Sequence, residues 1–187
     1  NYKIEKSENE LPLILWNHRW EHDKNPEAFF DALIELSKMG STFKLAVLGE
    51  EFKEELPCFT NARKQLEMHI VQFWYTDSFE DYANWLWKAD ILPVTSNQDF
   101  FGGSIMEAVY CNTIPLLPKQ LTYPELFQMN ENPQLFYKDE DDLINKLGSF
   151  IENIDKIQNQ NLNGIAEKYD WSNMVEKYDE EFVKFLS

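Results

Sequence analysis

The sequence predicts an α/β protein built on one doubly wound parallel sheet of about six strands. Three observations predict this fold class. Short, fully apolar runs recur along the chain, as expected of strands that are buried on both faces. Segments with helical signals separate these runs, and strands that alternate with helices form parallel sheets with right-handed crossovers. No linker, repeat or low-complexity segment interrupts the 187 residues, so we expect a single domain over residues 1–187.

Six apolar runs are the candidate strands. In chain order they are LILWN (13–17), FKLAVLG (43–49), HIVQF (69–73), ILPVT (91–95), TIPLL (113–117) and a weaker LFY (135–137). In the usual strand order, 3-2-1-4-5-6, the winding reverses between the first and fourth strands, and ligands bind beyond their carboxyl ends. The loops 17–24 and 95–103 are therefore the candidate ligand-binding loops.

Capping signals mark the helices that lie between the strands. Asn25 precedes Pro26 at a predicted helix start, and Gly40 follows the end of that helix. Ser78 and Asp81 resemble a capping box that opens a helix reaching to about residue 89. After the sixth strand the sequence predicts two acidic helices and a last helix over about 172–185. The apolar positions of this last helix are Met174, Val175, Tyr178, Phe182 and Phe185.

Composition excludes several classes of protein. Hydrophobic residues make up 43% of the chain and aromatic residues 15%, which is typical of a globular protein. No apolar run reaches the roughly 18 residues that a membrane helix needs. A net charge of −16 argues against this domain gripping a nucleic-acid backbone by itself. Cys58 and Cys111 provide neither a disulfide framework nor zinc-ligand spacing, so we expect buried thiols and a cytoplasmic location.

The stretch DFFGGSIMEAV (99–109) falls at the second candidate loop and holds two acids, Asp99 and Glu107. If all of it were helical, these carboxylates would lie about 12 Å apart. That separation is too large for the roughly 5 Å pair of a retaining glycosidase. The glycines instead predict a loop that turns sharply into a helix, which could bring both acids to one site.

Gly102, Gly103 and Ser104 are expected to form the first turn of that helix, whose amides favour an anion such as phosphate. A glycine-eased turn beneath a buried helix is the equally weighted alternative. On the other loop, Arg19 and Lys24 are cations suited to a diphosphate, although each taken singly is more often a surface charge.

Other polar residues near these loops allow alternative roles. His18 and His22 could act as acid, base or hydrogen-bond donor, and His22 could equally stabilise its loop. His69, at a strand start, is expected to be structural. Tyr123 and Glu125 in LTYPELF either line the crevice or belong only to a turn.

Together these residues resemble a known pattern. TSNQDFFGGSIMEAVYCNTIPLLP is similar to the nucleotide-sugar half of retaining glycosyltransferases with the GT-B fold, a Rossmann-like domain. The cations at the first loop match the same group. The matching positions in the longer motif are Ser96, Asp99, Phe101, Gly102, Glu107, Ala108 and Pro115.

More narrowly, HRWEHDKNPEAFFDAL, FFGGSIMEAVYC and YPELF resemble the tRNA-queuosine mannosyltransferase family. This resemblance implies transfer of mannose from GDP-mannose onto queuosine in tRNA, with retention and with no metal or other cofactor. It also implies that the chain is a fragment that lacks an N-terminal, acceptor-binding half. No membrane partner is expected.

The same resemblance implies the role of each site residue. Arg19 and Lys24 would bind the donor diphosphate, together with the backbone of Gly103 and Ser104. Glu107 would hold the ribose. Asp99 would hold hydroxyls of the transferred sugar, so that these acids and cations carry catalysis.

Three departures from the family pattern bear on specificity. Asp99 stands where Glu is usual, which shortens the side chain by one methylene and bears on which sugar is held. Asn112 replaces a usual Gly, a mild change because Asn tolerates left-handed backbone. The residues 73–75, FWY, stand where many relatives carry a Gly near the nucleotide base, which bears on base preference.

Two other functions are compatible with the sequence. One is a nucleotide-sugar-binding module without transfer activity, and the other is an acidic adaptor with a non-functional crevice. A dehydrogenase is disfavoured because no Gly-x-Gly-x-x-Gly fingerprint follows the first predicted strand.

Overall fold

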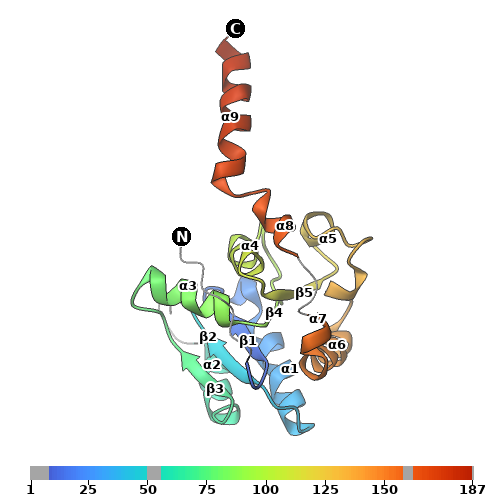
Figure 1. The fold of residues 1–187 in the computed structure, drawn as a ribbon. Helices are drawn as coiled ribbons and strands as arrows, with labels where there is room; N and C mark the ends of the chain where they lie inside the picture. The colour runs from blue at the N-terminus through green and yellow to red at the C-terminus, as the bar shows by residue number, and fades with distance from the viewer. Residues whose placement is uncertain (1–8, 50–55, 158–161, 187) are drawn as a thin grey trace.

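Six parallel strands form the centre of the molecule (Figure 1), in the order β3-β2-β1-β4-β5-β6. The structure is a computed structural model that describes residues 9–49, 56–157 and 162–186. The strands are β1 Leu13–Trp16, β2 Lys44–Val47, β3 Ile70–Phe73, β4 Ile91–Pro93, β5 Ile114–Pro118 and β6 Phe136–Tyr137. This order confirms the doubly wound α/β sheet and places the switch point between β1 and β4.

Helices cover both faces of the sheet. On one side α1 packs against α2 and α6, and on the other α4 packs against α3 and α8. The main helices are α1 Pro26–Lys38, α2 Pro57–Gln65, α3 Phe79–Lys88, α4 Gly103–Tyr110, α6 Glu140–Glu152 and α9 Trp171–Leu186. The short ones are η1 His22–Lys24, α5 Tyr123–Leu126, η2 Pro133–Leu135, α7 Ile154–Ile157 and α8 Asn163–Glu167.

The predicted caps are present at the helix ends. Asn25 adopts left-handed backbone with φ 50° and its side chain accepts the Ala28 amide at 3.4 Å. Ser78 accepts the Asp81 amide at 3.0 Å, and its hydroxyl donates to the Asp81 carboxylate at 2.7 Å. Each cap satisfies amides that a helix start would otherwise leave unpaired, so α1 and α3 begin where the sequence predicts.

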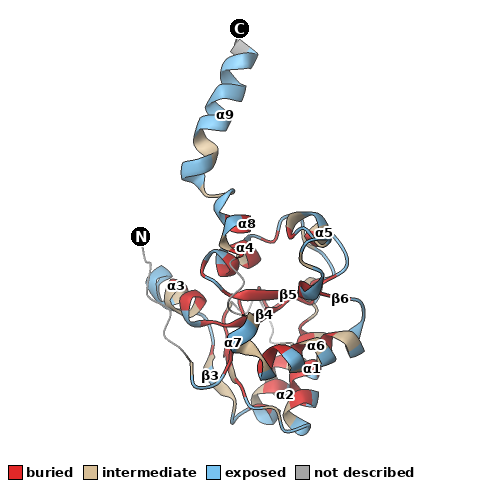
Figure 2. Cartoon of the chain, turned by 45° about the vertical axis from the view of Figure 1, so that its right-hand side comes forward, coloured by how far each residue is buried: buried red, intermediate tan, exposed pale blue. Residues whose placement is uncertain are grey.

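The central strands are buried on both faces (Figure 2), which explains why their sequences are apolar without alternation. Ile14, Leu15 and Trp16 of β1 are fully buried. The structural role expected of His69 is confirmed, since its ring nitrogens contact the Ser37 hydroxyl at 2.9 Å and the Phe43 carbonyl at 3.0 Å. Both cysteines are free thiols; Cys111 is buried as expected, but Cys58 is only partly buried.

The last helix, α9, extends away from the rest of the molecule (Figure 1) and is exposed over most of its length (Figure 2). The predicted helix is confirmed, and of its apolar positions Met174 and Val175 are partly buried while the other three are exposed. Tyr178, Phe182 and Phe185 are 47%, 65% and 85% exposed. In the described part of the chain no helix is both long enough and apolar enough to cross a membrane.

Candidate functional site

The two loops at the switch point are hydrogen-bonded to each other. The Thr95 hydroxyl, just beyond β4, lies 2.9 Å from the carbonyl oxygens of both Lys24 and Asn25. The Asn97 amide donates to the Asp23 carbonyl at 2.8 Å. The loops after β1 and β4 therefore form one joined surface, as the strand order predicts.

Between these loops lies a cavity of about 550 Å³, which we call the loop cavity. Its lining residues are Arg19, Glu21, His22, Asp23, Lys24, Gln98, Asp99 and Phe100. Lys24 Nζ donates to the Gln98 carbonyl at 3.0 Å and lies 3.4 Å from Asp99 Oδ2. The Lys24 and Asp99 side chains are only 12% and 14% exposed, so each charged group restricts the position of the other.

Asp99 is held from three directions. Besides Lys24, the Gly102 amide donates to Asp99 Oδ1 at 2.9 Å and the Tyr123 hydroxyl donates to Oδ2 at 3.2 Å. Burial, with the charge of Asp99, raises the pKa of Tyr123 well above its ordinary value, so this hydroxyl stays protonated. Tyr123 thus belongs to the site, whereas Glu125 of the same turn is exposed.

Arg19 lies at the exposed mouth of the loop cavity, with 55% of its side chain accessible. Its guanidinium pairs with Glu21 at 3.1 Å and with Asp23 at 3.8 Å. These contacts are to its own loop, and exposed pairs of this kind are weak. An incoming anion could therefore compete for the guanidinium.

The start of α4 carries the geometry of an anion site. Gly102 has left-handed backbone with φ 71°, which favours glycine, and α4 begins at the next residue. The amides of Ile105 and Met106 both donate to the Gly102 carbonyl. Among the described residues no backbone acceptor meets the amides of Gly103 and Ser104. Such amides, at the positive end of a helix dipole, favour an anion.

His18 and Asn17 attach the end of β1 to this helix start. His18 Nδ1 lies 3.0 Å from the Ser104 hydroxyl, and Asn17 Nδ2 donates to the Ser104 carbonyl at 2.8 Å. Burial and, next, the charge of Lys24 lower the pKa of His18 from 6.5 to about 4. His18 is therefore neutral at pH 7. The exposed ring of His22 lies 3.8 Å from Glu27.

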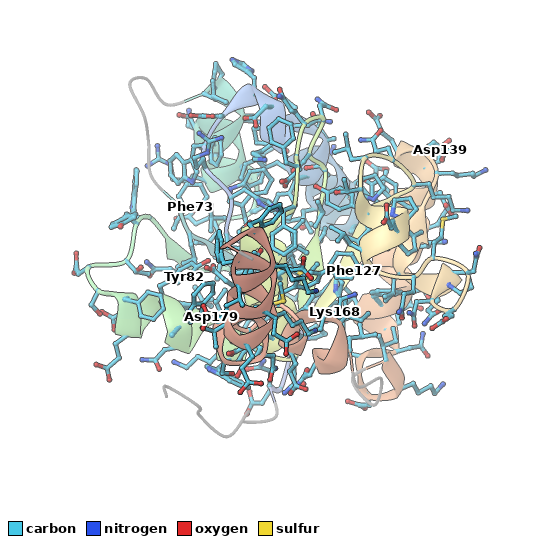
Figure 3. All side chains as sticks on the ribbon, turned by 90° about the horizontal axis from the view of Figure 1, so that it is seen from above. Phe73, Tyr82, Phe127, Asp139, Lys168 and Asp179 are labelled. Atoms are coloured by element: carbon cyan, nitrogen blue, oxygen red, sulfur yellow. The ribbon has the colours of Figure 1, made fainter. Side chains whose placement is uncertain are left out.

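Glu107 lies on the other side of the α4 start from Asp99. It borders a second cavity of about 580 Å³ between α3, α4 and α8, which we call the α3–α4 cavity. There Glu107 Oε2 accepts a hydrogen bond of 2.8 Å from Tyr82, a residue that Figure 3 labels on α3. The two acids thus line different cavities, separated by the glycine turn. Over the described ranges, no group of three or more His, Cys, Asp or Glu side chains is arranged to hold a metal ion.

The protein family described as "Glycosyl transferases group 1" matches this chain over residues 2–168. The chain belongs to the group 1 glycosyl transferases. The curated tRNA-queuosine alpha-mannosyltransferase of Drosophila melanogaster is 35% identical over 114 residues, which are 61% of this chain and 30% of that protein. The glycosyltransferase resemblance read from the sequence is confirmed.

Solved structures of glycosyl transferases share the fold of this chain. Sucrose-phosphate synthase from Thermosynechococcus elongatus superposes with a TM-score of 0.73 at 14% identity, over 95% of this chain and 46% of that one. A glycosyltransferase from Rickettsia africae gives 0.73 at 18% identity, over 96% and 49%. The Rossmann-like half of a GT-B fold is therefore confirmed. The chain spans about half or less of the length of these proteins.

Two residues of this candidate site were missed by sequence reasoning. Asn17 and Tyr82 lie 3.4 Å apart, between Asn17 Nδ2 and the Tyr82 hydroxyl, and connect β1, α3 and α4. Asn17 ends the first apolar run, and ligands bind beyond the carboxyl ends of parallel strands. This position was the signal that could have identified Asn17 as a site residue. Tyr82 gives no such signal, because a Tyr one turn into an amphipathic helix is usually a packing residue.

Proposed function

We propose that this chain is the donor-binding half of a retaining mannosyltransferase that transfers mannose from GDP-mannose to queuosine in tRNA. The observation that carries the proposal is its 35% identity with the Drosophila tRNA-queuosine alpha-mannosyltransferase. The site geometry is consistent with such a donor, because cations, helix amides and two separate acids follow one another along the surface.

The diphosphate of the donor would lie between the two loops. Lys24 and Arg19 supply positive charge from one side, and the amides of Gly103 and Ser104 supply donors from the other. In the transition state, negative charge grows on the departing diphosphate, and preorganised donors stabilise it most there. These groups would do so without a metal ion.

The transferred sugar would lie at Asp99. Its carboxylate is oriented by Gly102 and Tyr123, so it can accept sugar hydroxyls with little further loss of side-chain freedom. Glu107, across the glycine turn, would accept the ribose hydroxyls.

The stereochemistry of donor and product supports the proposal of retention. The name of the Drosophila relative specifies an α-mannosyl product. GDP-mannose carries its sugar in α linkage, so transfer to an α product retains the configuration at the anomeric carbon.

The acceptor would be held by a further, N-terminal half of the enzyme. The matched part of the chain covers only 30% of the Drosophila protein, which leaves ample length for a second domain. The apolar residues exposed on α9 are a surface against which that half would pack. Because this chain carries a net charge of −16, contacts to the tRNA backbone would come mainly from the other half, in the cytoplasm.

Full-length enzyme, GDP-mannose labelled in the sugar, and tRNA test the proposal. We expect label to enter tRNA that carries queuosine and not the same tRNA carrying guanine at that position. Nuclear magnetic resonance of the released nucleoside should show the α anomer. A protein that binds GDP-mannose but labels no tRNA would instead support the binding-module alternative.

A further inference from the structure

Tyr82 forms the only described side-chain contact to the Glu107 carboxylate. Its hydroxyl, on α3, donates to Glu107 Oε2 at 2.8 Å. The Tyr82 ring is partly buried against the core, while Glu107 is exposed. A partly buried hydroxyl on α3 therefore donates to an exposed carboxylate on α4.

The same hydroxyl is connected to the glycine turn. Asn17 Nδ2 lies 3.4 Å from the Tyr82 hydroxyl and donates to the Ser104 carbonyl at 2.8 Å. Asn17 is buried. The contacts thus run from the start of α4, through the end of β1, to α3 and back to Glu107 on α4. They fix the carboxylate relative to the amides of Gly103 and Ser104.

The hydroxyl is suited to act as a permanent donor. Burial, and next the negative charge of Glu107, raise the pKa of Tyr82 far above its ordinary value. Hydrogen bonds from a hydroxyl to a carboxylate are short and strong. A free Glu side chain loses rotamer freedom when it is ordered, and a preformed contact reduces that loss on binding.

We propose that Tyr82 is a positioning residue that holds the Glu107 carboxylate ready to accept the vicinal hydroxyls of a nucleotide ribose. The proposal rests on the proposed donor binding and goes beyond it by assigning a residue of α3 to ribose recognition. Among the described contacts no donor reaches Glu107 Oε1, which leaves that oxygen for the ligand.

A purely structural role for Tyr82 predicts a different behaviour. If its hydroxyl only joins α3 to α4, Tyr82→Phe lowers the melting temperature and affects all ligands alike. If it positions Glu107, the loss depends on the ribose hydroxyls. The comparison of GDP with 2′,3′-dideoxy-GDP separates these outcomes, because the two nucleotides differ only in those hydroxyls.

The test is calorimetric titration of this chain and its Tyr82→Phe variant with both nucleotides. We expect Tyr82→Phe to weaken GDP binding about 5- to 10-fold and to leave dideoxy-GDP binding within about 2-fold. Tyr110→Phe is the matched control. Tyr110 lines the same cavity one turn beyond Glu107, and no described hydrogen bond involves its hydroxyl, so both affinities should stay at the wild-type values.

A double-mutant cycle of Tyr82 and Glu107 provides a second test. In a Glu107→Ala background, Tyr82→Phe should cause no further loss of GDP affinity, because the group that it positions is gone. Equal losses for both nucleotides, an unchanged GDP affinity, or an additive cycle would overturn the inference while the proposed donor binding stands. If the unmodified chain binds neither nucleotide, the proposed function fails and this inference fails with it.

Discussion

Lys24 is the residue at which the two site loops meet, since its ammonium contacts Gln98 and Asp99 of the other loop. Arg19 is the second cation, but it lies at the exposed mouth. A charge-assisted hydrogen bond contributes about 1.5–3 kcal/mol. We therefore expect Lys24→Ala or Arg19→Ala to weaken GDP binding by roughly 10- to 150-fold while guanosine binding hardly changes.

The two variants should differ in stability, which differential scanning fluorimetry measures. Arg19→Ala removes an exposed side chain and should leave the melting temperature within a few degrees of wild type. Lys24→Ala removes the cation that pairs with the largely buried Asp99 carboxylate and should lower the melting temperature more. Lys38→Ala, an exposed lysine on α1 paired with Glu35, is the control for loss of charge alone. Equal losses for guanosine and GDP would mean that neither cation contacts phosphate.

His18 gives a prediction for the pH dependence of stability. Its pKa is lowered from 6.5 to about 4, so between these values the unfolded chain binds a proton that the folded chain does not. Stability therefore falls as the pH decreases through this window, by about 2 kcal/mol between pH 7 and pH 5 from His18 alone.

Urea unfolding of wild type and His18→Asn at pH 7 and pH 5 checks this expectation. The variant lacks the titrating ring, so its loss of stability between the two pH values should be smaller by about 2 kcal/mol, whatever its stability at pH 7. Parallel losses in the two proteins would show that His18 is protonated equally easily in the folded and unfolded states.

Among the elements, the turn into α4 both adopts left-handed backbone and supplies the amides that would bind the ligand. A Cβ on Gly102 would lie 3.0 Å from Ile105 Cδ1 in left-handed backbone, whereas nothing lies within 4 Å of a Cβ on Gly103. Gly102→Ala should therefore lower the free energy of unfolding by about 1–2 kcal/mol. Gly103→Ala should not lower it, because Ala favours a helix by about 1 kcal/mol over Gly.

The Gly103→Ala substitution should affect GDP binding differently from stability. If the phosphate binds the Gly103 and Ser104 amides as proposed, a methyl group on Gly103 would hinder its close approach, so Gly103→Ala should weaken GDP binding although the protein stays fully folded. Gly164→Ala in α8, whose Cβ would also meet nothing within 4 Å, should leave GDP binding unchanged. Unaltered GDP affinity in Gly103→Ala would remove the α4 start from the site.

The elements could be predicted from the sequence because their signals are local. Asn25 with Pro26, and Ser78 with Asp81, identify helix starts through short-range hydrogen bonds, and the apolar runs identify strands. The observed strands are up to three residues shorter than those runs: the second ends at Val47, although Leu48 and Gly49 continue the pattern. Pairing with neighbours decides where a strand ends, and one sequence does not contain that information.

The site was predicted only where it follows from topology. The switch point brings Lys24 to Asp99, and both were singled out. The contacts of Tyr123 with Asp99 and of Tyr82 with Glu107 join segments that are 24 and 25 positions apart. Such contacts depend on helix packing, which periodicity does not specify. For the same reason the placement of Asp99 and Glu107 in two cavities, on either side of the glycine turn, could not be predicted.

For the molecule as a whole, the exposed last helix is the feature that the core does not account for. The sheet and its helices bury a continuous core, but α9 extends from it with exposed aromatic residues. The relatives are two to three times longer than the segment that they share with this chain. The proposed function assigns donor binding to this chain and acceptor binding to a further half of the enzyme.

Calorimetric titration of this chain with GDP, UDP and ADP shows whether these residues alone form a donor-nucleotide site. We expect one saturable site for GDP, tighter than for UDP or ADP, and loss of that binding in the Lys24→Ala variant. Tighter binding of UDP would keep the donor site and replace the proposed GDP-mannose. An absence of heat from all three nucleotides at millimolar concentration would contradict the account.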